Sequence, residues 1–422
     1  MQKNSRKLNK FRKQVAELLE QFGYECYRKD VPTPKTYAFI TCPTPMVDDI
    51  TMEFDLEYFN KGEAYYYAPY MSIDVSLISD VYQNDPNDSS PLYQKREEFY
   101  RLLLSGKEYK HITPEGKEIK VQVDLLDEQK VERNTFRAMR NWKGIQKNDF
   151  MWDFIITINC MPLVAVVIEP TTPGKKPLQD ALEILQQELK ADKALGTYVQ
   201  FCIVSDGKHT LVGSATDPIE NYKPWNSLTG EESTKEDPLM PFLSMLRPDR
   251  LINILLNYNR IMGTIQGETT SFLADYHIFF AVEKAISAYR RMKEEENDTQ
   301  EIGHIRLIEA EENLSQAVFG SQAATCMEIL ENRLFLPEML SDDVLVLQLP
   351  DETIAEGMFK YYGGKQLLIL GPDMSYEYIC QMLKKHPESR AIQIATAPLG
   401  PTLKRFIGPC LYSPTQIIKP YE

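Results

Sequence analysis

The sequence lacks the marks of several protein classes. No apolar run among its 422 residues approaches the ~18–20 residues that a helix needs to cross a bilayer. The basic start, MQKNSRKLNKFRKQ, has no apolar stretch behind it and does not resemble a secretory signal. The seven cysteines are widely spaced without a CxxC pair, and the five histidines are scattered, which argues against disulfide scaffolds and zinc sites. We therefore expect a cytoplasmic protein with reduced thiols and no membrane contact.

Positive charge is also scarce. Lys and Arg number 47 against 61 Asp and Glu, so the net charge is −14, and a broad basic surface for nucleic acid is not expected. A local basic groove stays open as an alternative. The best candidate for contacts with DNA phosphates is a cluster near the start of the chain: Lys3, Arg6, Lys7, Lys10, Arg12 and Lys13. The competing interpretation is a solvated helix end.

Apolar periodicity predicts an α/β core. Residues 8–22 carry one apolar stripe at helical spacing, and Gly23 ends it. The clearest pattern lies between 151 and 214 and predicts, in order, strands at 153–159 and 163–170, a helix at 178–195, and strands within 199–207 and 208–216. The first two strands are separated by a short Met-Pro turn. They predict a buried hairpin at the centre of a mixed sheet with flanking helices.

The second half of the chain predicts a connector and another α/β segment. Residues 241–293 follow a helical pattern after a polar stretch at 228–240. Short apolar strands are predicted further on, at 344–349, 366–370 and 391–396. At roughly 100–200 residues per domain, the length suggests two or three domains. We predict boundaries that give 1–240, 241–300 and 301–422.

Two carboxylates mark the ends of the predicted hairpin. Asp153 opens its first strand and Glu169 closes its second, and an antiparallel hairpin brings these open ends together. Paired carboxylates there could bind Mg²⁺, which prefers oxygen ligands and can activate water for phosphodiester hydrolysis. In the PD-(D/E)xK nucleases, which use this arrangement, a lysine follows the glutamate by two residues. The alternative is that both acids only occupy turns at strand ends.

The expected lysine position holds Thr171, which is neutral and short. Lys175 and Lys176 lie just beyond, and either could reach back to the carboxylates as the catalytic cation. The candidate catalytic and metal-binding set is therefore Asp153 and Glu169, with Lys175 as the displaced lysine.

These motifs resemble the N-terminal nuclease domain of the restriction (R) subunit of type I restriction–modification enzymes. The resemblance covers Asp153, the Asn-Cys-Met-Pro-Leu-Val turn at 159–164 and Glu169. It continues through Ser-Asp-Gly at 205–207 and a Tyr-His-Ile-Phe-Phe-Ala-Val run at 276–282. It implies a PD-(D/E)xK nuclease-like domain over 1–240, a helical connector, and a truncated RecA-like motor remnant over 301–422. The family's Gln-x-x-x-Tyr pair falls on Ile184 and Glu188, so the resemblance also shows erosion.

The motor segment has lost its phosphate-binding loop. Where the family has Gly-Ser-Gly-Lys-Ser, this chain has Ala-Glu-Glu-Asn-Leu at 310–314, and Asn313 occupies the lysine position. Glu309, Glu311 and Glu312 would repel a triphosphate, so we expect no ATP binding.

Two functions follow from the resemblance. The first is a pseudoenzyme that binds DNA, or the modification and specificity subunits, in restriction–modification and phage defence. The second is an active Mg²⁺-dependent DNA endonuclease that uses Lys175 or Lys176. A decayed gene product is a third interpretation. The resemblance also suggests, more weakly, that Glu17 or Glu20 on the first helix adds a third carboxylate to the metal site.

Overall fold

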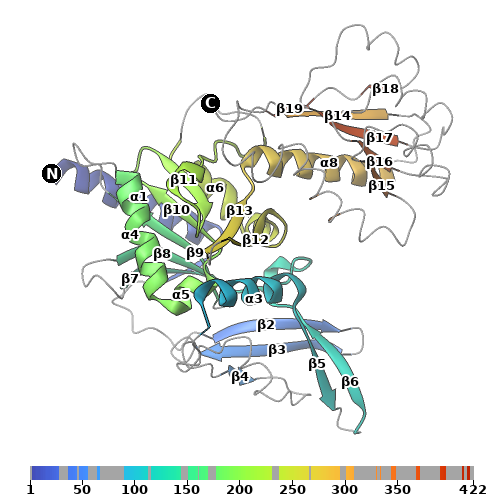
Figure 1. Ribbon diagram of the computed structural model, residues 1–422, viewed down its shortest axis with the longest axis horizontal. Helices are drawn as coiled ribbons and strands as arrows, with labels where there is room; N and C mark the ends of the chain where they lie inside the picture. The colour runs from blue at the N-terminus through green and yellow to red at the C-terminus, as the bar shows by residue number, and fades with distance from the viewer. Residues whose placement is uncertain are drawn as a thin grey trace. The chain divides into compact units, whose positions relative to one another are not determined.

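A computed structural model of the chain forms two compact units, Met1–Trp225 with Glu236–Leu273, and Asn226–Lys235 with Ala274–Glu422 (Figure 1). The structure describes residues 2–27, 37–44, 47–55, 64–66, 90–112, 116–143, 151–159, 161–169, 177–230, 237–265, 268–294, 301–307, 329, 333, 344–347, 367–370, 390–395, 411–412 and 416–418. The residues predicted as one connector, 241–300, are shared between the two units.

The first unit is built on a six-stranded mixed sheet in the order β1-β7-β8-β9-β10-β11. Its strands are β1 (Glu25–Tyr27), β7 (Phe136–Lys143), β8 (Met151–Ile158), β9 (Met161–Ile168), β10 (Phe201–Ser205) and β11 (Thr210–Ser214). Strands β8 and β9 form the predicted antiparallel hairpin at its centre, and β10 runs parallel to β9. All eight residues of β9 are buried, as its unbroken apolar run requires of a central strand. The predicted mixed α/β sheet is confirmed.

The turn of this hairpin depends on Asn159. Its φ of 50° lies in the left-handed region, which asparagine tolerates better than most residues. Its side chain accepts a hydrogen bond from the Thr135 N at 2.9 Å and donates one to the Leu125 carbonyl at 3.0 Å. The turn is thereby joined to the segment that leads into β7.

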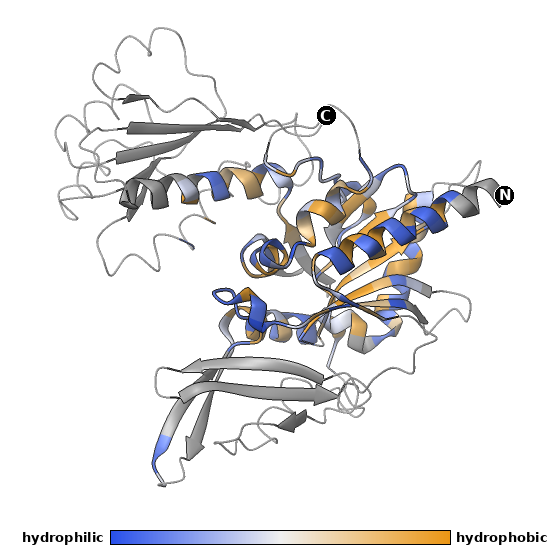
Figure 2. Cartoon of the chain, turned by 180° about the vertical axis from the view of Figure 1, so that it is seen from behind, coloured by the Kyte–Doolittle hydropathy of each residue, from blue (hydrophilic) through white to orange (hydrophobic). Residues whose placement is uncertain are grey.

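Helices cover the sheet. Helix α1 (Gln2–Gln21) buries Phe11, Val15 and Leu19 of the predicted stripe, and Leu8 beside them. Leu18 and Phe22, also predicted in the stripe, are half-buried. Helix α4 (Pro177–Ala191) packs its leucines into a cluster with the sheet residues Ile155, Ala165 and Val167. Figure 2 shows the central strands in the hydrophobic colour.

The single helix predicted over 178–195 is wrong in one detail. The helix is interrupted at Asp192, and a second helix, α5 (Lys193–Tyr198), follows directly. The Asp192 Oδ1 accepts a hydrogen bond from the Leu195 N at 3.1 Å, so this aspartate caps the second helix.

Further elements complete the first unit. One helix, α3 (Leu92–Ser105), precedes the hairpin of β5 (Lys107–Ile112) and β6 (Glu118–Val123), and a separate sheet contains β2 (Tyr37–Thr44), β3 (Val47–Asp55) and β4 (Ala64–Tyr66). The short helices are η2 (Val131–Arg133), η3 (Ile219–Asn221), α6 (Met240–Met245), α7 (Pro248–Asn253) and the π-helix η4 (Ile254–Tyr258).

The predicted helix over 241–293 is wrong between 259 and 273. There β12 (Asn259–Ile265) pairs with β13 (Glu268–Leu273), because tertiary pairing and the β-branched residues of this segment favour strands.

The second unit contains α8 (Tyr276–Glu294) and an all-parallel sheet. Its strands are β15 (Val344–Leu347), β16 (Leu367–Leu370), β17 (Arg390–Ala395), β14 (Glu301–Leu307) and β18 (Leu411–Tyr412), in that order, with β19 (Gln416–Ile418) also paired to β14. The three strands predicted from apolar runs are confirmed as β15, β16 and β17. Parallel pairing is typical of α/β proteins. The RecA-like assignment of this unit stays a prediction.

Candidate functional site

The central hairpin places the two predicted carboxylates at neighbouring positions. Asp153 lies in β8, one residue before Phe154, which pairs with Val166 in β9. The Ile168 N donates a hydrogen bond to the Asp153 Oδ2 at 2.6 Å. Glu169 follows Ile168 directly, and its N donates to the Ser205 carbonyl at 2.9 Å. Asp153 therefore lies against the backbone that leads into Glu169, as the hairpin geometry predicts.

A cation from α1 joins these two strands. The Arg12 Nε donates to the Asp153 Oδ1, and its Nη2 donates to the Ile168 carbonyl. Arg12 follows the buried Phe11 on the helix, so the packing of the apolar stripe carries the guanidinium to the edge of the hairpin. The Arg12 side chain is 29% exposed and that of Asp153 only 10%. One partly exposed guanidinium thus bridges β8 and β9 at a mostly buried carboxylate.

Burial governs the electrostatics of this pair. Loss of solvent raises the pKa of Asp153 above its usual value, while the charge and hydrogen bond of Arg12 and the Ile168 N–H act in the opposite direction. Arg140, whose guanidinium lies 5.5 Å from the Phe154 ring centroid, also favours the ionised form. Arg12 is therefore the principal group that stabilises the ionised form of Asp153 in this buried position.

The arrangement around Asp153 does not fit a bound Mg²⁺. Both carboxylate oxygens already accept hydrogen bonds from nitrogen donors, whereas Mg²⁺ requires oxygen ligands in near-octahedral geometry. Among the described residues, no group of three or more His, Cys, Asp or Glu is placed to hold a metal ion. Glu17, suggested as a third ligand, is exposed and pairs with the Lys13 Nζ at 3.1 Å, and Glu20 is exposed as well.

Several predicted site residues lie outside the described ranges. They are Thr171, both candidate displaced lysines, Lys175 and Lys176, and Asn313, which was predicted to replace the lysine of a phosphate-binding loop. Ile184 and Glu188, which were predicted to fall at the family's Gln and Tyr positions, are in α4. Ile184 packs against the core cluster, and Glu188 is buried.

The described part of the basic N-terminal cluster divides in two, and the side chains of Lys3 and Arg6 lie outside the described residues. Lys7, Lys10 and Lys13 are exposed on α1, as both the DNA-contact and the solvated-helix interpretations require. Arg12 instead turns toward Asp153, a role that its place in the sequence does not reveal. The signal that could have found it is its position beside the buried stripe, where a long cationic side chain can reach the sheet.

Within the described residues, no helix has the length and apolar character needed to span a membrane.

Comparison with known proteins agrees with the motifs. A family model described as "Type I restriction enzyme R protein N terminus" matches residues 9–221. The chain is similar to the Type I restriction enzyme HindI endonuclease subunit of Haemophilus influenzae, with 25% identity over 236 residues, or 52% of this chain and 21% of the relative. It is also similar to the Putative type I restriction enzyme MjaVIIIP endonuclease subunit of Methanocaldococcus jannaschii, with 21% identity over 179 residues, or 42% of this chain and 17% of the relative.

The chain thus matches about a fifth of the length of these curated relatives. The family model covers the six-stranded sheet, the Asp153–Arg12 pair and Glu169. The chain therefore belongs to the family of type I restriction enzyme R proteins, through their N-terminal domain.

Proposed function

We propose that this protein acts in restriction–modification as a binding component, and that its nuclease site is closed. Its partners would be DNA or the modification and specificity subunits of a type I system. The observation that carries the proposal is the bridge from Arg12 to Asp153 and the Ile168 carbonyl. It supports the proposal because the Arg12 guanidinium already engages Asp153, one of the two carboxylates that would bind a metal ion.

The closure has a physical basis. A guanidinium that forks onto a carboxylate and a carbonyl neutralises the charge that would attract Mg²⁺. A metal ion could bind only after Arg12 left the carboxylate, and the cost of removing a partner from a buried charge opposes that step. Thr171 adds to the effect, because a neutral side chain at the lysine position cannot stabilise the negative charge that develops on the phosphorane oxygens.

An active Mg²⁺-dependent endonuclease is the second candidate function. It is favoured by the position of Asp153 beside the residue that precedes Glu169. In that case Arg12 would move away when metal binds, and Lys175 or Lys176 would supply the missing cation.

Plasmid cleavage with Mg²⁺ or Mn²⁺ and without ATP separates the two. We expect no difference between the wild type and Glu169→Ala, because the site is closed. Nicking by the wild type that Glu169→Ala abolishes would establish the second function and overturn the first. Arg12→Gln removes the guanidinium that bridges Asp153 and the Ile168 carbonyl, and the same cleavage assay on this variant tests whether the bridge closes the site. Lys10→Gln, which removes one exposed charge from the same helix, is the matched control.

Binding is tested by co-elution with the modification and specificity subunits of a type I system, and by retention on duplex DNA. We expect a stable complex at micromolar concentration with one of them. Failure of both would count against the binding role.

We further propose that the second unit is a motor remnant that does not bind ATP. Its parallel sheet supports the motor ancestry, and Asn313 at the lysine position supports the loss of nucleotide binding. ATP should leave the melting temperature unchanged, since only a ligand of the native state raises it. A clear stabilising shift would contradict this part of the proposal.

A further inference from the structure

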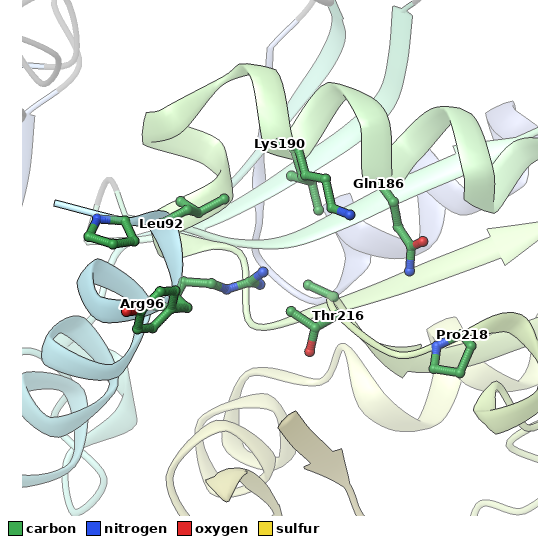
Figure 3. Close-up of a pocket in the computed structure, with 10 residues that line it drawn as sticks. Leu92, Arg96, Gln186, Lys190, Thr216 and Pro218 are labelled. Atoms are coloured by element: carbon green, nitrogen blue, oxygen red, sulfur yellow. The ribbon is translucent and has the colours of Figure 1, made fainter. Parts of the chain in front are cut away.

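A cavity of about 540 Å³ lies in the first unit, away from the Asp153–Arg12 bridge (Figure 3). It is open to solvent on one side and is bordered by the start of α3, the second half of α4 and the turn after β11. Its lining includes Pro91, Leu92, Tyr93, Arg96, Gln186, Leu189, Lys190, Ala215, Thr216 and Pro218. Pockets for small molecules typically measure about 300–1,000 Å³. The cavity is therefore large enough for a small-molecule ligand.

The most unusual group in the cavity is Arg96. Its side chain is 7% exposed, and its Nη2 donates a hydrogen bond to the Val199 carbonyl at 2.8 Å. Among the described residues, no carboxylate lies within ion-pair distance of its guanidinium. Burial lowers the pKa of Arg96 to about 10, so it remains charged at neutral pH. Buried charges in proteins are normally paired, and this one faces a cavity instead.

Asp217 is the described carboxylate that acts on Arg96 through space, but it is engaged elsewhere. Its carboxyl accepts hydrogen bonds from the Ser214 N, at 3.3 Å, and from the Asn221 side chain. Burial raises the pKa of Asp217 to about 7, so it neutralises Arg96 only in part at neutral pH. The guanidinium keeps donors for an anion from solution.

Two further features favour an anion. Figure 3 shows Lys190 and Arg96 directed toward the same space from α4 and α3. The first turn of α3 also lines the cavity, and no side-chain hydrogen bond caps this helix at its N-cap residue, Pro91. The positive end of a 14-residue helix therefore adds to the two cations.

The rest of the lining is mixed. Leu92, Leu189, Ala215 and Pro218 supply aliphatic surface, Tyr93 supplies an aromatic ring, and Gln186 and Thr216 are polar. We propose that this cavity binds a small phosphate monoester that also contains a flat ring, such as a nucleoside monophosphate. Two cations and a helix N-terminus match a dianion better than a single carboxylate, and the apolar wall matches the ring. The proposal is independent of whether the Asp153 site cuts DNA.

Calorimetric titration of the full chain tests the site with AMP, inorganic phosphate and adenosine as probes. We expect AMP to bind, phosphate to bind more weakly, and adenosine to show no binding at the same concentration. Lys190→Glu should weaken AMP binding by at least about tenfold, because it reverses one of the two charges. Lys208→Glu makes the same charge change at an exposed position outside the cavity and should bind AMP as the wild type does.

Three results would overturn the proposal. They are no binding of AMP or phosphate at millimolar concentration, equal binding of AMP and adenosine, and unchanged affinity in Lys190→Glu. Arg96→Met gives a second test, provided that its melting curve shows a folded protein. It should abolish AMP binding, and retained affinity would remove Arg96 from the site.

Discussion

Asp153 and Arg96 are two charges buried in the same unit, and the fold treats them differently. Asp153 meets a guanidinium from α1, and both of its oxygens accept hydrogen bonds. Arg96 meets one backbone carbonyl and a cavity. The first charge is satisfied within the chain, and the proposal that no metal ion binds there rests on this. The second is incompletely satisfied, and the proposal of an anion site rests on that. A buried charge therefore suggests an external ligand only when its internal partners are missing.

The strongest test of this contrast is removal of the Arg12 side of the pair. Arg12→Met should destabilise the protein by about 2–3 kcal/mol, since loss of one partner leaves the Asp153 charge buried and unpaired. The value is set below that of a fully buried pair because Arg12 is 29% exposed. Urea denaturation monitored by circular dichroism measures the change.

The double variant Arg12→Met/Asp153→Asn is the control for this prediction. It should recover most of the lost stability, because a neutral amide costs less than an unpaired carboxylate at that position. Lys10→Met, at an exposed position on the same helix, should change little. A double variant no more stable than Arg12→Met would show that Arg12 acts through packing and not through its charge.

A smaller effect is expected from the acid near the cavity. Burial raises the folded-state pKa of Asp217 from 3.8 to about 7. Because the folded pKa is the higher one, its contribution is fully present below pH ~4 and is lost as pH rises through ~7. The loss should be on the order of 1–2 kcal/mol, below the full linkage value because the side chain is partly exposed.

Melting temperatures of the wild type and Asp217→Asn between pH 5 and 8 provide the measurement. The wild type should lose stability relative to the variant as pH increases, because the amide does not ionise. Parallel pH profiles would show that Asp217 titrates normally and neutralises Arg96 fully.

The hairpin and its helices could be predicted from the sequence because they depend on local patterns. The apolar runs that became β8, β9 and β10 are buried on both sides, and the leucine stripe of α4 has helical spacing. The same reasoning failed at β12 and β13, where pairing between two short strands outweighed a helical pattern.

The site was predictable only in part. Asp153 and Glu169 could be predicted to lie close together, because a hairpin with a short turn determines which residues of its two strands are neighbours. The Arg12 bridge spans 141 residues and depends on how α1 docks, which no local pattern encodes. The cavity likewise combines three distant segments, and Arg96 reaches Val199 over 103 residues. Contacts of this kind follow from tertiary packing alone.

The smallest change in stability is expected for the removal of Arg96. Arg96→Met removes a charge that has no described carboxylate partner, so no opposite charge is left unpaired, unlike in Arg12→Met. The Val199 carbonyl loses one donor, which costs about 1 kcal/mol, and relief of the buried charge offsets part of it. In urea denaturation, the free energy of unfolding of Arg96→Met should therefore lie within about 1 kcal/mol of the wild-type value. Arg96→Met should be clearly more stable than Arg12→Met. A loss of stability as large as that of Arg12→Met would mean that Arg96 is needed for folding. The contrast between Asp153, which is paired within the chain, and Arg96, which is only partly paired, would then fail.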